Sequence, residues 1–134
     1  MDNLSPDGIV DEFQERWKRS ELVEKMPEPI LVANGPLVEL TLIAVYEAHQ
    51  HKGYATRALR MLTALCDKNG VTITLTARRL DTGALSHFAP GCPPTFSTEQ
   101  LVSWYARHGF VNTTAPGDDT RTMERHPRTQ LAPT

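Results

Sequence analysis

The segment with the clearest chemical potential is Gln50-His51-Lys52-Gly53-Tyr54-Ala55, which lies between an apolar run and a helical pattern. A glycine-bearing turn that leads from a strand into a helix presents several backbone N–H groups at the positive end of the helix dipole. Such a turn binds anions, and it suits phosphate above all. Whether this segment forms an anion site or a simple turn depends on the elements around it.

An amphipathic helix is expected near the start of the chain. Ser5-Pro6 is a typical helix start, with serine as the cap and proline in the first turn. Val10, Phe13 and Trp17 recur at helical spacing, so we expect a helix from Asp7 to about Lys25. Its apolar stripe would pack on the protein's own core; a membrane surface or a partner is the alternative.

A hairpin, a helix and a strand surround the anion turn. Asn34-Gly35 is a strong two-residue hairpin signal, and it joins expected strands at 30–32 and 37–45. After the turn, apolar residues at helical spacing predict a helix over 53–68, and Asn69-Gly70 is a good C-cap for it. The β-branched, alternating run 71–77 then predicts a strand.

The C-terminal part begins with a long loop, expected over 78–95 from its prolines and other turn formers. Ser97 and Gln100 fit a capping box that opens a short helix. Short strands are expected at 110–111 and 120–125. The chain is therefore expected to be a mixed α/β protein in the order α-β-β-α-β-loop-α-β-β.

Bulk properties indicate one globular domain. The 134 residues are 40% hydrophobic, and we expect a single domain over 1–134, with 1–27 holding the first helix and 127–134 a frayed tail. The net charge of −2 does not point to nucleic acid or to an anionic membrane as a partner. No apolar run is long enough to span a bilayer, and the first residues lack a signal core, so a cytoplasmic location is expected.

The cysteines and the histidines near the turn give no metal-site pattern. Cys66 and Cys92 are expected to be a buried thiol and a loop thiol, with a disulfide as the alternative. His49 and His51 flank Gln50, but no third ligand accompanies them, so no metal is expected there.

Two motifs in order carry a family resemblance. The turn reads Gln50-x-x-Gly53-x-Ala55, and a later segment reads Tyr105-x-x-x-Gly109-Phe110. Each motif alone is weak, but a strand precedes the first, and a helix and a strand separate the two. This arrangement, over about 37–111, resembles the GNAT superfamily of acyl-CoA-dependent N-acetyltransferases, as a compact or N-terminally reduced member. The resemblance implies the GNAT acyltransferase fold and acetyl-CoA as cosubstrate.

The resemblance also implies a cofactor site. Backbone amides at 51–56 would cradle the pyrophosphate, and the strand before the turn would pair with the pantetheine arm and hold the thioester carbonyl. Thr98 stands where the family often has an asparagine that contacts the cofactor. The implied cofactor-binding residues are Ile43, Ala44, Val45, Gln50, His51, Lys52, Gly53, Tyr54, Ala55, Thr56 and Thr98. Lys52, Arg57 and Arg60 add positive charge, and a solvated helix face is the alternative for these three.

Two side chains are candidates for catalysis. The resemblance places Tyr105 as the general acid that protonates the leaving CoA thiolate; a core aromatic is the alternative. Glu39 is the one charged side chain in the run 37–45, and it is the best candidate for the base that deprotonates the amine. A glutamate that faces solvent is the alternative. His87 and Phe88 could contact substrate, or the loop that holds them could have no such role.

These features together imply an N-acetyltransferase that moves an acetyl group from acetyl-CoA to a primary amine by direct attack in a ternary complex. Neither cysteine has an evident histidine partner, so no covalent acetyl-enzyme is expected. A non-catalytic GNAT-fold protein that binds CoA or a partner is the alternative, favoured by Thr98 and by the reduced N-terminal half. The acceptor stays open, as does a homodimer paired through sheet edges.

Overall fold

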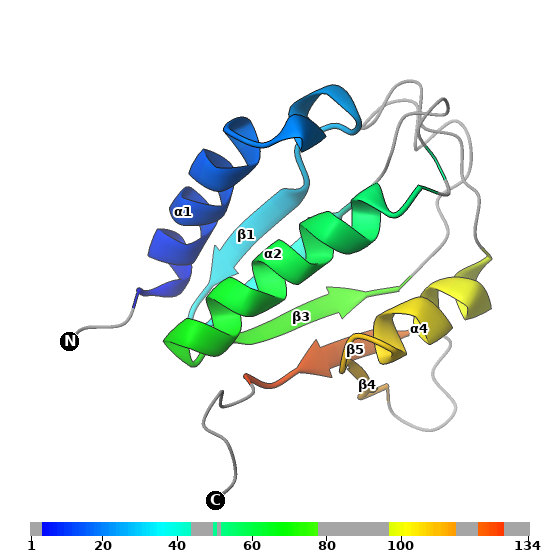
Figure 1. The fold of residues 1–134 in the computed structure, drawn as a ribbon. Coiled ribbons are helices and arrows are strands. Elements are labelled where there is room, and N and C mark those ends of the chain that lie inside the picture. Colours follow the sequence, from blue (N-terminus) through cyan, green and yellow to red (C-terminus); the bar gives the residue numbers. More distant parts are fainter. Residues whose placement is uncertain (1–3, 44–49, 51, 78–96, 115–120, 128–134) are drawn as a thin grey trace, which may run out of the picture.

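A computed structural model describes residues 4–43, 50, 52–77, 97–114 and 121–127 of the chain (Figure 1). The described elements are a five-stranded sheet, three α-helices and a short 3-10 helix. In chain order they are α1 (Pro6–Lys18), η1 (Glu21–Glu24), β1 (Ile30–Asn34), β2 (Leu37–Leu42), α2 (Tyr54–Asn69), β3 (Thr72–Thr76), α4 (Thr98–Ala106), β4 (Val111–Asn112) and β5 (Thr122–Arg125). This is the mixed α/β fold class that the sequence predicted.

The sheet has the strand order β1-β2-β3-β5-β4. β2 and β3 are its parallel pair, joined through α2, and the other neighbouring pairs are antiparallel. A crossover between adjacent parallel strands requires a long connection, which α2 supplies. The start of α2 therefore lies at the end of the sheet where β2 finishes.

All three α-helices lie over one face of the sheet (Figure 1). Buried apolar side chains of the central strands point toward the helices, and they include Val38, Leu40, Ile73, Leu75 and Met123. They pack against the buried faces of the helices in one core cluster. The alternate strand residues, which point to the opposite face, are half-buried or exposed. This alternation is what a sheet covered on one side requires.

The first helix is shorter than predicted. α1 ends at Lys18, and Ser20 then adopts an extended backbone at φ −96° and ψ 165°. The Ser20 hydroxyl accepts a hydrogen bond from the Leu22 amide, so it caps the separate helix η1 and stops α1 from continuing to Lys25. The buried stripe is also shifted: Ile9 is buried with Phe13 and Trp17, whereas Val10 is only half-buried.

The hairpin between β1 and β2 is present, but its turn lies one residue later than predicted. Asn34 pairs with Leu37, so the two turn residues are Gly35 and Pro36 rather than Asn34-Gly35. Gly35 has φ +59°, and the fixed negative φ of Pro36 follows it. A positive φ followed by a negative φ is typical of a type II′ turn. This turn also keeps Pro36, which has no N–H, out of the paired strands. The proline decides the register here.

The remaining elements follow the predictions with shifted ends. β2 ends at Leu42, three residues before the predicted end of the strand, so Ile43 lies beyond it. α2 has the expected helical span and ends at Gly70, whose φ of +69° makes it a left-handed C-cap. The capping box of Ser97 and Gln100 is confirmed, with both of its hydrogen bonds present. The predicted loop 78–95 and tail 127–134 lie outside the described residues, except Pro127.

No helix in the described ranges is long and apolar enough to cross a membrane.

Candidate active site

The parallel strands β2 and β3 are paired over only part of their length. Their register joins 37–39 to 72–74, and the last pair is Glu39 with Thr74. β2 continues to Leu42 and β3 to Thr76, but no pairing between them is present in these described segments. We call residues 40–42 and 75–76 the unpaired strand ends because they do not pair with each other, although the first segment pairs with β1 and the second with β5 along their other edges. They lie at the end of the sheet where β2 leads toward α2, which is where open α/β sheets bind ligands.

The start of α2 differs from the starts of the other described α-helices. The hydroxyls of Ser5 and Ser97 cap α1 and α4 by accepting backbone hydrogen bonds. α2 begins after Gly53, which has φ +84° and provides no side-chain cap. The first hydrogen bond of α2 runs from the Arg57 amide to the Gly53 carbonyl at 3.0 Å. The first turn of α2 therefore has backbone donors without a side-chain acceptor from a cap, as an anion site requires.

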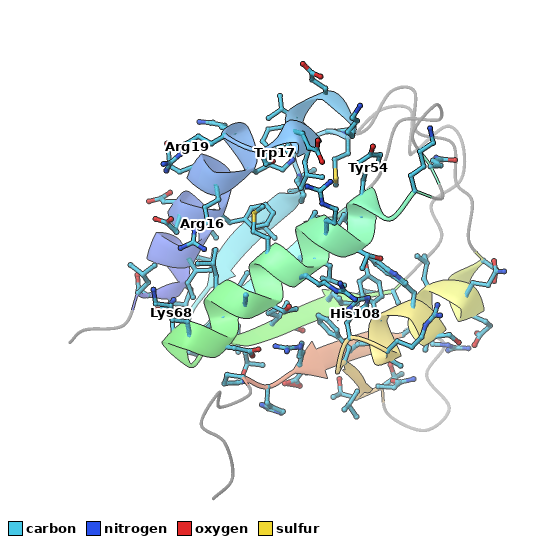
Figure 2. The ribbon with its side chains drawn as sticks, viewed as in Figure 1. Arg16, Trp17, Arg19, Tyr54, Lys68 and His108 are labelled. Carbon is cyan, nitrogen blue, oxygen red and sulfur yellow. The ribbon has the colours of Figure 1, made fainter. Side chains whose placement is uncertain are left out.

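Positive side chains surround this first turn. The ring of Tyr54 has Lys25 Nζ and the Arg57 guanidinium carbon each 5.8 Å from its centroid. Figure 2 labels Tyr54 at the start of α2. Arg57 also forms an ion pair with Glu21 of η1, and this hydrogen bond lowers the pKa of the Glu21 carboxyl. Lys52 is exposed in the turn that precedes the helix. Lys25, the residue after η1, thus brings a cation to the same turn, whereas η1 itself brings the Glu21 carboxylate that pairs with Arg57.

Helix α4 is attached to the first turn of α2 by a specific contact. The indole N–H of Trp104 donates to the Thr56 hydroxyl at 3.2 Å. Tyr105 follows Trp104 directly, and their ring centroids are 4.8 Å apart. The Tyr105 ring also meets Phe110 edge-on at 5.4 Å. The Trp104 contact therefore ties the position of Tyr105 to the start of α2.

Tyr105 is buried in the core cluster, with a relative exposure of 7%. Burial disfavours the charged phenolate, so it raises the pKa of Tyr105 well above its ordinary value. The side chain therefore keeps its proton across the neutral range. It is both a core aromatic and a protonated donor.

Glu39 lies on the opposite face of the sheet from the helices. Its neighbours along β2, Val38 and Leu40, point into the core, so Glu39 points away from it. Glu39 is half-buried, and the Thr41 hydroxyl donates to its carboxylate at 3.4 Å. The two candidate catalytic residues therefore lie on different faces of the sheet.

The structure brings only part of the implied cofactor site together. Gly53 caps α2, and the next three residues form the first turn; Gln50 and Lys52 lie in the turn before it. Ile43 is half-buried directly after β2. Ala44, Val45, His51, His87 and Phe88 lie outside the described residues.

Thr98 is the first residue of α4, six residues before Trp104. At 1.5 Å per residue, it lies ~9 Å along the helix axis from the residue that contacts α2. Its role as a cofactor contact therefore stays a prediction.

Sequence reasoning missed the contacts that fix the helices relative to one another. Arg125 of β5 is 5% exposed, and its guanidinium donates to both carboxylate oxygens of Asp67, at 2.7 and 3.0 Å. Its Nε also donates to the His108 carbonyl at 2.8 Å. One side chain thus joins α2, the turn after α4 and β5. Because 58 residues separate Arg125 from Asp67, no local pattern in the sequence predicted this ion pair.

His108 and Cys66 lie close to the ion pair of Arg125 and Asp67. His108 lies between α2 and α4 (Figure 2), and its pKa is lowered first by burial and then by nearby arginine charges. Burial raises the pKa of the Cys66 thiol to about 12, so the thiol stays protonated. No group of three or more His, Cys, Asp or Glu side chains among the described residues is placed to hold a metal ion.

Comparison with known proteins agrees with the architecture. Residues 13–89 match the model of the acetyltransferase (GNAT) family. The match covers β2, the turn and α2, and it ends before α4 and Tyr105. A search of curated proteins finds no match. Because the matched segment exceeds half of the 134 residues, the chain belongs to the acetyltransferase (GNAT) family.

Proposed function

We propose that this protein moves an acetyl group from acetyl-CoA to a primary amine in a ternary complex. Membership of the acetyltransferase (GNAT) family indicates an acyltransferase in general. The start of α2 and the unpaired strand ends support acetyl-CoA as the donor, a primary amine as the acceptor and direct attack as the mechanism.

The observation that carries the proposal is the start of α2. Gly53 gives this helix no side-chain cap, and Lys25, Lys52 and Arg57 lie around the first turn. Backbone N–H groups at a helix start, with nearby cations, favour a pyrophosphate. A CoA pyrophosphate at this turn lets its pantetheine arm run along β2 into the unpaired strand ends, where the edge of residues 40–42 that faces β3 has no pairing with β3.

The chemistry then proceeds across the sheet. The amine reaches the thioester from the face of Glu39, and either this carboxylate or a water that it holds accepts the amine proton. The nitrogen forms the new C–N bond while the C–S bond breaks. The CoA sulfur leaves as a thiolate toward the face of Tyr105 and takes up a proton. The amine adds to one face of the planar carbonyl, and the tetrahedral oxyanion that results collapses with loss of the thiolate.

The raised pKa of Tyr105 defines what its hydroxyl can do. A thiol has a pKa of ~8.5 and a phenol one of ~10, so full proton transfer to the thiolate is unfavourable even before burial raises the phenol further. A charge-assisted hydrogen bond from the hydroxyl to the developing thiolate is favourable. Tyr105 therefore stabilises the leaving sulfur, and solvent supplies the proton afterwards.

Cys66 does not supply a covalent route. The thiolate is the nucleophilic form of cysteine, and a pKa of about 12 leaves almost none of it at neutral pH. The Cys66 side chain is also fully buried. Direct attack by the amine on acetyl-CoA accounts for transfer without it.

The test is a product measurement with the purified protein. Incubation with acetyl-CoA and single amines from a panel should yield the acetylated amine, detected by mass, together with an equal amount of free CoA. Acetyl-CoA hydrolysis without an amine gives the background. CoA release that never exceeds this background, with no acetylated product from any amine, would refute the proposed activity.

A CoA-binding protein without turnover is the second candidate. The burial of Tyr105 favours it, because a side chain that is only 7% exposed has limited access to a ligand. The two candidates differ in a single-turnover experiment. Both bind acetyl-CoA, but only the enzyme converts stoichiometric acetyl-CoA to CoA faster when an amine is added.

A further inference from the structure

Trp104 of α4 contacts α2 through a hydrogen bond and its own neighbours through its ring. The indole N–H donates to the Thr56 hydroxyl at 3.2 Å, and only 9% of Trp104 is exposed. The indole ring lies 4.8 Å from the Tyr105 ring and meets the His108 ring edge-on at 5.4 Å. Figure 2 shows His108 between the two helices. Trp104 therefore lies where α2, α4 and the proposed donor Tyr105 meet.

Thr56 also contributes a backbone group to the proposed cofactor site. It is the third residue of α2, and the first hydrogen bond within this helix comes from the next residue, Arg57. The Thr56 amide is therefore one of the N–H groups at the helix start that are proposed to bind the pyrophosphate. The Thr56 side chain accepts the Trp104 hydrogen bond. A phosphate at the start of α2 and the indole of Trp104 thus contact the same residue.

A second attachment holds the turn after α4. The Arg125 guanidinium donates to the His108 carbonyl at 2.8 Å, and it donates to the Asp67 carboxylate at 2.7 and 3.0 Å. Asp67 and Thr56 lie near opposite ends of α2. Loss of the Trp104 hydrogen bond would therefore leave the Arg125 attachment in place and allow α4 to roll about its own axis.

A small roll of α4 is enough to affect the proposed chemistry. Side chains reach ~5–6 Å from a helix axis, so a roll of about 10° moves the end of a side chain by ~1 Å. A misplacement of ~1 Å can slow a reaction by as much as about 10²-fold. A hydrogen bond from the Tyr105 hydroxyl to the leaving sulfur also weakens steeply as its geometry departs from the ideal. The Trp104 contact is thus placed to control this donor.

We propose that Trp104 and Thr56 are positioning residues that hold the Tyr105 hydroxyl in register with CoA bound at the start of α2. The Thr56 amide binds the phosphate, the Thr56 hydroxyl fixes the indole of Trp104, and the indole fixes the neighbouring phenol. Neither side chain contacts the reacting atoms, and both act through Tyr105. This inference rests on the proposed function, because it states how two parts of that site act together.

Thr56→Val removes the hydrogen-bond acceptor but keeps the shape of the side chain and the backbone amide. It should lower kcat about tenfold, which is less than the loss expected for Tyr105→Phe, because the phenol is misplaced and not removed. The KM for acetyl-CoA should change by less than about twofold, since the amide that binds the phosphate remains. Thr56→Ser keeps the hydroxyl and should recover most of the lost kcat.

Thr63→Val is the matched control on the same helix. The Thr63 hydroxyl donates to the Arg60 carbonyl at 3.1 Å, so this variant removes a hydrogen bond within α2 instead of one between helices. It should leave kcat unchanged. An equal loss of kcat in Thr63→Val and Thr56→Val would show general damage to α2 and would overturn the proposal.

A combination with Tyr105→Phe shows whether Thr56 acts through the phenol. In a protein that already lacks the Tyr105 hydroxyl, Thr56→Val should cause no further fall in kcat, because no donor is left to misplace. A further tenfold fall would show that the two residues act independently. That result, or an unchanged kcat in Thr56→Val alone, would overturn the positioning role.

A binding experiment tests the link between the helices without turnover. The chain has two tryptophans, and the indole N–H of Trp17 is buried without a hydrogen-bond partner among the described residues. The indole N–H resonances of isotope-labelled protein, assigned with Trp17→Phe, therefore report one bonded and one unbonded group. Addition of CoA should shift the Trp104 resonance more than the Trp17 resonance. Thr56→Val should reduce this difference.

The outcomes separate this inference from the proposed activity. A CoA-dependent shift of the Trp104 resonance in a protein that transfers no acetyl group would keep the link and refute only the activity. CoA binding or acetyl transfer without a shift of that resonance would refute the link and keep the activity. Absence of CoA binding would overturn both.

Discussion

At the scale of single residues, Tyr105 combines two properties that usually belong to different residues. Its ring is part of the core, packed against Trp104 and Phe110, and its hydroxyl is the proposed donor to the leaving sulfur. The contact from Trp104 to Thr56 holds that hydroxyl in a fixed relation to the start of α2. The fold therefore serves Tyr105 by positioning its hydroxyl, and not by lowering the pKa of that hydroxyl.

Tyr105→Phe separates the two properties. The ring and its packing remain, so the free energy of unfolding should change by less than ~1 kcal/mol, within the range of a single neutral hydrogen bond. Loss of the hydroxyl should lower kcat about 10²-fold with little change in the KM for acetyl-CoA. Because the pKa of Tyr105 is raised, its ionisation should cause no fall in kcat up to about pH 9.5. Unchanged kcat in Tyr105→Phe would remove the residue from the mechanism.

His108 gives a pH dependence of stability whose sign follows from its surroundings. Burial, and then the charges of Arg60, Arg107 and Arg125, lower the pKa of His108 in the folded protein. The unfolded chain takes up this proton at about pH 6.5, so the unfolded state binds more protons as the pH falls below that value. The free energy of unfolding should therefore decrease between about pH 7.5 and about pH 5.5.

Urea unfolding at the two pH values measures this effect. His108→Gln should reduce the loss of stability on acidification, and His126→Gln, which removes an exposed imidazole, is the control. An equal loss in His108→Gln and in the unchanged protein would contradict the assignment.

At the scale of elements, the buried pair of Arg125 and Asp67 fixes how α2, α4 and β5 meet. A single substitution leaves one charge buried without its partner, so Arg125→Met and Asp67→Leu should each cost about 3–5 kcal/mol. The double variant removes both charges and should recover most of that loss. Urea unfolding of the four proteins gives the coupling energy. A double variant that loses the sum of the single effects would show that the two side chains act independently.

Local sequence signals predicted the elements well but not their ends. Gly53 and Gly70 limit α2 as expected, and Ser97 and Gln100 start α4. The ends that moved were decided by competing local effects: Ser20 caps a new turn and ends the first helix, and Pro36 moves the hairpin turn by one residue. Residue propensities alone do not predict which of two neighbouring signals decides where an element ends.

The candidate site was predicted where it is local in sequence and missed where it is not. The turn into α2 is a short continuous segment, so its glycine and its helix start were recognisable. The contacts from Trp104 to Thr56 and from Arg125 to Asp67 join residues 48 and 58 positions apart. Nothing in one sequence states which distant polar groups will meet, although the buried indole N–H of Trp104 did require some partner.

At the scale of the whole molecule, the two faces of the sheet carry different parts of the proposed site. The helical face holds the core, the start of α2 and Tyr105. The opposite face, which no described helix covers, holds Glu39. The unpaired strand ends lie at one end of the sheet, between its two faces. The proposed donor and acceptor come together there.

The central claim is that the start of α2 binds the pyrophosphate of CoA, and a pair of glycine variants tests it most directly. Gly53 and Gly70 both have positive φ, and an added Cβ would meet no atom within 4 Å at either position. Gly53→Ala and Gly70→Ala should therefore each cost about 1–2 kcal/mol of stability through backbone strain. They lie at opposite ends of α2, so only the first can disturb the proposed site.

Calorimetric titration with CoA compares the two variants with the unchanged protein. The unchanged protein and Gly70→Ala should bind CoA alike, and Gly53→Ala should bind at least ~10-fold more weakly, because its methyl group occupies the space that lets the phosphate approach the backbone. No CoA binding by the unchanged protein, or equal affinity in the two variants, would contradict the account.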